Sequence, residues 1–193
     1  MSASVQATPY QQNPISNGVL GMVLLLVTEI MFFMGLISAY IVNRAGVSDW
    51  PPIGQPRLPI EVTGVNTVFL LLSAFTLYRL GKAIGRNRKT GFWLSITLFL
   101  GFLFVAIQGY EWIQLIGFGL TTSSGIYASF FYAIIGMHGF HVLMGTGFLI
   151  YLGASIRRSS SGEQVLGRFH AVSLFWYFVV GIWPLLYYLV YIM

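Results

Sequence analysis

The run GIYASFFYAIIGMHGFHV, Gly125–Val142, decides what kind of protein this is. It contains no Lys, Arg, Asp or Glu, and with the residues that follow it is long enough to cross a membrane as a helix, which takes about 20 apolar residues. His138 and His141 lie three residues apart within it, so a helix presents both on one side. Ionisable side chains at membrane depth are costly, and each therefore indicates a functional site.

The composition places the whole chain in lipid. Of its 193 residues, 56% are hydrophobic and 8% are charged, against about 25% charged in ordinary soluble domains. The 10 Lys and Arg residues fall in predicted loops and not along one face, which argues against a nucleic-acid partner. The absence of cysteine excludes disulfides, thiolate metal sites and cysteine nucleophiles. The sequence predicts an all-α integral membrane protein.

Five apolar segments follow a polar tail, residues 1–17. We expect residues 18–193 to form a single membrane domain, a bundle of five transmembrane helices. The segment GFGLTTSSG, Gly117–Gly125, is the predicted turn that divides the longest uncharged run. The predicted spans are about Gly18–Val42, Val62–Ile84, Phe92–Leu115, Ile126–Leu152 and Phe169–Ile192.

The basic residues predict an orientation. The segments Arg79–Lys89 and Arg157–Arg168 hold eight of them and join predicted spans on the side of the N-terminal tail. The opposite side holds Arg44 and Arg57 only. Because loops rich in Lys and Arg stay in the cytoplasm, we expect a cytoplasmic N-terminus and a C-terminus outside.

The outer loop Arg44–Glu61 contains four prolines. Its Pro51 and Pro52 stiffen the chain, and Trp50 is suited to the membrane interface. We interpret it as an ordered interfacial cap over the helix ends.

The ionisable residues inside the spans are few. By depth, Glu29, His138 and His141 lie near the midplane, Glu111 near the outer face, and His170 at the cytoplasmic start of the last span. A carboxyl group buried in lipid is unfavourable unless it is paired or protonated. We expect a buried polar network in which Glu29 is protonated or accepts a hydrogen bond from a histidine, completed by Gln108 or a tyrosine. This network is structural, or it handles protons or contacts lipid.

Bound cofactors have less support. Two histidines on one helix face cannot supply axial ligands from opposite sides of a haem, and His170 is displaced by roughly 20 Å along the membrane normal. A metal held by Glu29, His138 and His141 is an alternative, since three ligands are the minimum for a catalytic site. Nucleotide-binding, metalloprotease and hydrolase motifs are absent. We assign no catalytic residue, metal or cofactor to this chain.

Many of the 22 glycines fall inside predicted spans. Small residues allow close approach of helices in lipid, so we expect nearly all of them to serve packing, and a Gly139→Leu change to disrupt it. The glycines concerned are Gly35, Gly101, Gly109, Gly136, Gly139, Gly145, Gly147 and Gly181.

Several motifs occur in a characteristic order: TEIMFF (Thr28–Phe33), DWPPIG (Asp49–Gly54), VNT (Val65–Thr67), QGYEW (Gln108–Trp112), SGIYASFFYAIIGMHGFHVLMG (Ser124–Gly145) and FWYFVVGIWPLLYYLVY (Phe175–Tyr191). Together they resemble subunit III of the haem-copper respiratory oxidases, the cytochrome c oxidase subunit III family, in its short five-helix bacterial form.

The resemblance implies a non-catalytic subunit of a terminal oxidase in the bacterial plasma membrane, where oxygen reduction is coupled to proton pumping. It implies packing against subunit I, contacts with other oxidase subunits and possible membership of a supercomplex. Haem and copper are expected in those partners, and phospholipid on this chain. Its implied roles are support of proton uptake and protection of the active centre during turnover. The family's buried glutamate matches Glu29, its Gln-x-x-Glu motif matches Gln108 and Glu111, and its histidine pair matches His138 and His141.

The last predicted helix departs from the family pattern W-H-F-V-D-x-x-W. Tyr177 replaces the histidine and Val180 the aspartate, so roles that depend on that aspartate do not carry over, and His170 occupies a position that is often acidic in longer members. Two alternatives stay open. One is an accessory subunit of nitric oxide reductase, which shares the fold. The other is a small independent transporter, although repeats and broken helices are typical of transporters and Pro184 is the only proline within a predicted span.

Overall fold

The computed structural model describes residues 17–47, 50–52, 56, 58–84, 89–158 and 162–193. Within these residues the chain is helical and contains no strand. Its elements are α1 (Asn17–Ala45), α2 (Ile60–Ile84), α3 (Thr90–Gly117), α4 (Ile126–Arg158), α5 (Gly162–Tyr187) and a short π-helix, η1 (Tyr188–Ile192). Five of the described helices are long and apolar enough to cross a membrane. The predicted fold, an all-α bundle of five transmembrane helices, is confirmed.

The helices extend beyond the predicted spans, most of all where α4 meets α5. The predicted spans ended at Leu152 and resumed at Phe169, whereas α4 continues to Arg158 and α5 begins at Gly162. The prediction followed hydrophobicity, but a helix can continue past the hydrocarbon, and arginines in its last turn interact favourably with the helix dipole. The predicted loop Arg157–Arg168 was therefore wrong, because both of its ends are helical.

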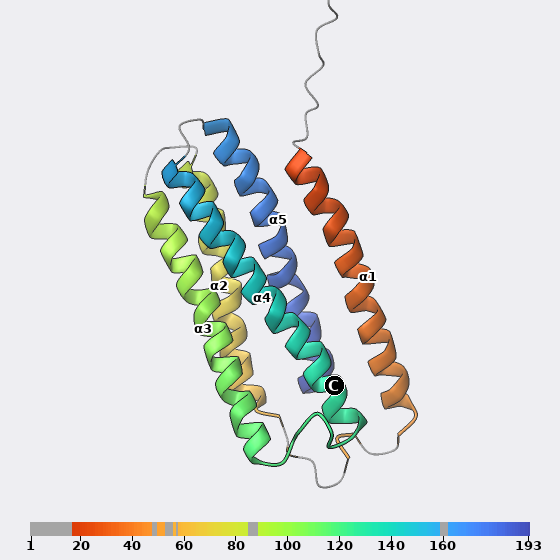
Figure 1. Cartoon of the computed structure of the whole chain (residues 1–193). Helices are drawn as coiled ribbons and strands as arrows, with labels where there is room; N and C mark the ends of the chain where they lie inside the picture. Colours follow the sequence, from red (N-terminus) through yellow and green to blue (C-terminus); the bar gives the residue numbers. More distant parts are fainter. Residues whose placement is uncertain (1–16, 48–49, 53–55, 57, 85–88, 159–161) are drawn as a thin grey trace, which may run out of the picture.

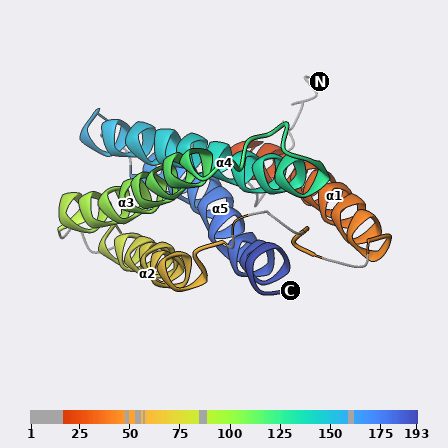
Figure 2. The ribbon, with the colours of Figure 1, turned by 90° about the horizontal axis from the view of Figure 1, so that it is seen from below.

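Helices α2 to α5 form a bundle, and α1 lies along one side of it (Figure 1). Helix α2 packs on α3, α3 on α4 and α4 on α5, while α1 packs mainly on α5 and α4. Seen along the helix axes, α1 lies far from α2 and α3 (Figure 2). Its buried residues are few, Phe33, Ile37 and Tyr40. Most of the surface of α1 is thus available to lipid or to a partner.

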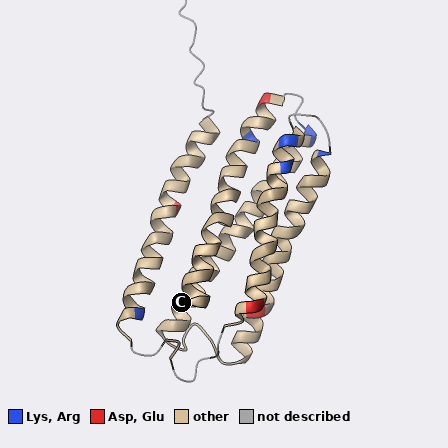
Figure 3. Cartoon of the chain, turned by 180° about the vertical axis from the view of Figure 1, so that it is seen from behind, with Lys and Arg blue, Asp and Glu red and all other residues tan. Residues whose placement is uncertain are grey.

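The beginning of α1 and the C-terminus lie at opposite ends of the bundle, as expected for five alternating spans (Figure 1). Most of the described Lys and Arg residues gather at the end where α4 finishes and α5 begins (Figure 3). Arg44 lies in the last turn of α1, at the other end. Arg57, Arg86 and Arg88 lie outside the described residues. Which end faces the cytoplasm stays a prediction from these charges.

Two tryptophans of α5 join this helix to α2 and α3 in the core. Trp176 is fully buried and donates from Nε1 to Ser73 Oγ of α2 at 3.0 Å. Trp183, also fully buried, donates from Nε1 to Thr67 Oγ1 of α2 at 2.8 Å. The ring of Trp183 also meets Phe104 of α3 edge-on at 4.9 Å. Each indole is therefore a large apolar group whose single polar atom is satisfied.

The glycines inside the spans divide into two groups. A Cβ at Gly101 or Gly145 would lie 2.6 or 2.9 Å from the ring of Trp176, so these glycines allow α3 and α4 to approach α5 closely. At Gly136 it would lie 3.2 Å from Trp112. A Cβ would meet nothing within 4 Å at the other five glycines, which are Gly35, Gly109, Gly139, Gly147 and Gly181. Contacts within the described part of the chain therefore support the packing interpretation for the first group and not for the second, and the effect of Gly139→Leu stays a prediction.

The predicted turn between α3 and α4 is confirmed and has a defined geometry. Gly119 has φ +90°, a conformation that suits glycine. The N–H of Leu120 donates to the carbonyl of Leu115 at 2.9 Å, and the N–H of Gly119 to that of Ile116 at 3.0 Å. This pattern is a Schellman motif, with the buried Leu115 and Leu120 as its apolar pair.

Candidate functional site

Glu29 and His141 form the most distinctive polar contact of the bundle. Glu29 lies near the middle of α1 and His141 near the middle of α4. Their atoms Oε2 and Nε2 are 2.9 Å apart. The side chain of His141 is 4% exposed and that of Glu29 18% exposed. A polar pair thus ties the otherwise exposed α1 to the bundle at mid-membrane depth, and the carboxyl group keeps some contact with the surroundings.

A single hydrogen bond joins the two side chains across this contact. His141 Nδ1 lies 2.7 Å from the carbonyl oxygen of Met137, which can only accept, so Nδ1 carries a hydrogen. The hydrogen between Nε2 and the carboxyl group of Glu29 belongs either to the acid or to the imidazole. The pair is neutral overall in both arrangements, which suits a medium of low dielectric constant. Chemically, such a pair can accept and release a proton.

His138 has different surroundings from His141. It is fully buried, stacks on Trp183 at 4.6 Å between ring centroids and meets Phe104 edge-on at 5.9 Å. Neither ring nitrogen of His138 has a hydrogen-bond partner within the described part of the chain. The two histidines therefore do not act as one site, and His138 is held by aromatic packing.

Gln108 and Glu111 belong to a separate cluster near the C-terminal end of α3. Gln108 Nε2 lies 3.2 Å from Glu111 Oε2 and donates to the hydroxyl of Tyr191 at 3.0 Å. The hydroxyl of Thr63 lies 2.9 Å from the same carboxyl oxygen. All four side chains are buried and come from α2, α3 and η1. The sequence prediction placed Gln108 beside Glu29, and the structure separates the two.

Thr63 and Tyr191 were missed as members of this cluster. A threonine in an apolar span and one tyrosine in an aromatic run give weak signals, because both residue types are common at membrane interfaces and in helix packing. Glu111, which is 3% exposed, was the stronger signal, since a buried carboxyl group requires partners. A search for hydroxyl residues near the same depth as Glu111 would have found both.

Of the predicted interfacial cap, Trp50, Pro51 and Pro52 are described, and Asp49, Ile53 and Gly54 lie outside the described residues. Trp50 Nε1 donates to the hydroxyl of Tyr40 at 3.1 Å, and that hydroxyl lies 3.1 Å from the carbonyl of Leu189. The Trp50 ring also meets Tyr127 edge-on at 5.1 Å. Trp50 thus joins the end of α1, the start of α4 and η1.

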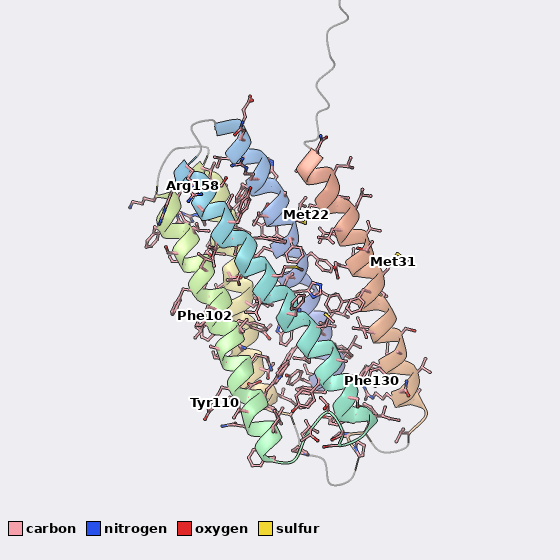
Figure 4. The ribbon with its side chains drawn as sticks, viewed as in Figure 1. Met22, Met31, Phe102, Tyr110, Phe130 and Arg158 are labelled. Atoms are coloured by element: carbon pink, nitrogen blue, oxygen red, sulfur yellow. The ribbon has the colours of Figure 1, made fainter. Side chains whose placement is uncertain are left out.

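A hollow of about 810 Å³ lies between α1, α4 and α5 at the end of the bundle where α1 begins. Met22 of α1 extends toward α5 along its edge (Figure 4). Phe148 and Val172 give it apolar walls, and Arg168, which donates to Ser155 Oγ, lies at its polar side. The hollow combines a cation, Arg168, and an anion, Glu163, with apolar surface.

No three His, Asp or Glu residues are grouped closely enough to hold a metal ion within the described part of the chain. Glu29 and His141 meet, but His138 faces the rings of Trp183 and Phe104. The structure therefore gives no support to a metal held by these three residues. His170 and Tyr177, on α5, are exposed, whereas Val180 is buried.

Comparison with known proteins identifies the family. Residues 4–193 match the family described as cytochrome c oxidase subunit III. The chain is similar to cytochrome c oxidase subunit 3 of Synechocystis, at 37% identity over 90% of this chain and 74% of the relative. It is also similar to the protein of that name from Thermostichus vulcanus, at 34% identity over 91% of this chain and 87% of the relative. The Salmo salar protein of that name is 34% identical over 92% of this chain and 70% of its own length. The chain therefore belongs to the cytochrome c oxidase subunit III family of membrane proteins of the respiratory chain.

Proposed function

We propose that this chain is a non-catalytic subunit of a haem-copper terminal oxidase in a bacterial plasma membrane. It packs against the subunit I that carries haem and copper, contacts other oxidase subunits, and holds phospholipid. Through these contacts it supports proton uptake and preserves the active centre during turnover. Family membership supports the assembly with oxidase subunits. The observation that carries the proton role is the contact between Glu29 and His141.

The position of this contact suits a proton-holding group. It lies at mid-membrane depth on α1, the helix with the largest surface free for a partner. A carboxyl–imidazole pair that takes up or releases one proton then carries a single charge, and the partly exposed carboxyl group of Glu29 keeps that charge in contact with its surroundings. The pair therefore acts as a local proton reserve beside the proton-conducting partner.

The hollow between α1, α4 and α5 is the proposed phospholipid position. Arg168 supplies a positive charge for a phosphate group, and Met22, Phe148 and Val172 supply apolar contacts for acyl chains. A volume of about 810 Å³ accommodates a headgroup and the first part of its chains. Such a lipid would fill the space between α1 and the bundle and fix the position of α1.

The test is purification of the complex in mild detergent through a tag on the N-terminus, with Glu29→Gln compared with the native chain. We expect a many-spanning partner with haem absorbance to co-purify with both. The variant should keep the haem content but lose activity faster during turnover or pump fewer protons per electron. Glu61→Gln, the same change at an exposed carboxyl group of α2, serves as the control and should behave like the native complex.

Three outcomes would contradict parts of this proposal. A chain that purifies alone and colourless would refute the oxidase role and favour a transporter. A partner that contains haem but no copper would point to nitric oxide reduction. Failure of Glu29→Gln to assemble would make the contact structural and remove the proton role.

A further inference from the structure

A hollow of about 410 Å³ lies between the beginning of α3 and the end of α4, at the end of the bundle where most of the described Lys and Arg residues gather (Figure 3). The two helices pack side by side and run in opposite directions (Figure 1). A Cβ at Gly153 of α4 would lie 2.7 Å from Leu94 of α3, so these two residues lie at the same level. One turn nearer the end of the bundle, Arg157 is therefore level with Thr90, and both line the hollow.

This α3–α4 hollow differs in charge from the phospholipid position proposed above. The earlier position, between α1, α4 and α5, contains both Arg168 and Glu163. Arg157 is the only charged residue among the described residues that line the α3–α4 hollow, and it forms no ion pair within that part of the chain. The neighbouring Lys89 and Arg158 add to the positive potential, as does the N-terminus of α3, which has no side-chain cap. The α3–α4 hollow therefore favours a ligand with a net negative charge.

Two hydroxyl groups in this hollow have no partner in the chain. Thr90 and Ser95 line it, and neither forms a side-chain hydrogen bond within the described residues. Every other serine and threonine of α2 and α3 does form one; these are Thr63, Thr67, Ser73, Thr76 and Thr97. Ser95 is exposed and Thr90 partly exposed, so both can be reached from outside. Because a hydroxyl group at membrane depth is unfavourable without a partner, the pair indicates an acceptor supplied by a bound molecule.

The order of groups along the hollow matches the order of groups in a phospholipid. Arg157 and Thr90, nearest the end of the bundle, can donate to a phosphate group. Ser95 lies five residues further into α3, about 7.5 Å along the helix axis, where an ester carbonyl below the phosphate can accept from its hydroxyl. Leu98 and Ile150 continue the lining with apolar surface. Ile150 is 59% exposed, so this part of the hollow opens toward lipid acyl chains.

We propose that the α3–α4 hollow binds one anionic phospholipid, with its phosphate at Arg157 and Thr90, an ester carbonyl at Ser95 and an acyl chain along Leu98 and Ile150. Inorganic phosphate has the charge but cannot make the apolar contacts. A zwitterionic phospholipid can make the contacts but has no net charge. Binding there requires only a chain that spans a membrane, so it does not depend on the proposed oxidase role.

The test uses the full chain in phosphatidylcholine nanodiscs that contain a small share of phosphatidylglycerol with a photoreactive diazirine on an acyl chain. Cross-linked peptides are identified by mass spectrometry, and we expect saturable labelling of residues 90–98 or 150–157. Unlabelled phosphatidylglycerol should displace the probe at a concentration about fivefold lower than phosphatidylethanolamine, which carries no net charge. Inorganic phosphate at the same concentration should not displace it.

Matched variants separate this site from a general attraction to the basic end of the bundle. Arg157→Gln removes the cation of the hollow and should weaken labelling about fivefold. Arg158→Gln removes the same charge from the next residue, which does not line the hollow, and should label like the native chain. Ser95→Ala removes one exposed hydroxyl group and should weaken labelling several-fold. Helix content and thermal unfolding of each variant identify any that misfolds.

The proposal fails if the anionic and the zwitterionic lipid displace the probe equally, or if inorganic phosphate displaces it as well as phosphatidylglycerol does. Equal weakening by Arg157→Gln and Arg158→Gln would reduce the effect to diffuse attraction and also overturn it. Labelling of the isolated chain that disappears in the purified complex would show that a partner protein, and not a lipid, occupies the hollow.

Discussion

The contact between Glu29 and His141 shows how one residue determines the position of a helix. Glu29→Leu would leave Nε2 of His141 buried without a partner, and we expect the free energy of unfolding to fall by about 1–3 kcal/mol. Glu29→Gln can donate from its amide to Nε2, and should lose less than about 1.5 kcal/mol. Reversible unfolding in mixed micelles measures both. Equal losses for the two variants would show that the hydrogen bond contributes nothing.

The two histidines show what a sequence can and cannot reveal about single residues. Their depth and the need of Glu29 for a partner follow from the sequence. Which histidine serves Glu29 does not, because positions three residues apart on a helix differ by about 60° in direction. That difference is enough to place His141 against α1 and His138 against Trp183. The sequence did not reveal the partners of Gln108 either, because they too depend on the direction in which each side chain leaves its helix.

At the scale of elements, the glycines beside Trp176 set the distances between helices. An added methyl group at Gly101 would lie 2.6 Å from the indole, so Gly101→Ala should destabilise the chain by about 1–3 kcal/mol. Gly139→Ala has open space and should stabilise its helix by up to about 1 kcal/mol. Thermal unfolding in detergent compares the two. A similar loss at both positions would refute the distinction between packing and open glycines.

The end of α3 offers a second comparison between neighbouring glycines. Gly119 has φ +90°, which disfavours any side chain, so Gly119→Ala should cost about 1–2 kcal/mol. Gly117 is the last residue of α3 with open space around it, and Gly117→Ala should be neutral or stabilising. Hydrogen exchange of the last turn of α3 reports both. Faster exchange in Gly117→Ala than in Gly119→Ala would contradict the Schellman geometry.

Elements are easier to predict from this sequence than their contacts. Each span has a long apolar run, so the number and approximate positions of the five helices follow from hydrophobicity alone. Their ends do not, since α4 continues to Arg158 beyond the apolar residues. Hydrophobicity also does not reveal which glycines lie at close contacts between helices, because that depends on how each helix is rotated about its axis. Gly139 and Gly145 are only six residues apart, yet only Gly145 touches Trp176.

At the scale of the whole molecule, the uneven distribution of positive charge predicts how the bundle lies in the membrane. The end where α2 and α4 finish holds all but one of the described Lys and Arg residues: Arg79, Lys82, Lys89, Arg157, Arg158 and Arg168 (Figure 3). The opposite end holds Arg44 only among the described Lys and Arg residues. Because the cytoplasmic end retains Lys and Arg, we expect the first end inside and the α3–α4 turn outside.

Single-cysteine labelling tests this orientation directly, since the native chain contains no cysteine. In intact cells or spheroplasts, a membrane-impermeant maleimide should label Gly46→Cys, after α1, and Thr122→Cys, in the turn between α3 and α4. Arg158→Cys and Gly162→Cys, at the ends of α4 and α5, should be labelled only after permeabilisation. All four positions lie at helix ends or in a turn, so their reactivity depends on which side of the membrane they face and not on how deep they lie within it. The reverse pattern would place the basic end outside and overturn the charge argument. Labelling of all four in intact cells would mean that the chain is not threaded through the membrane as five helices.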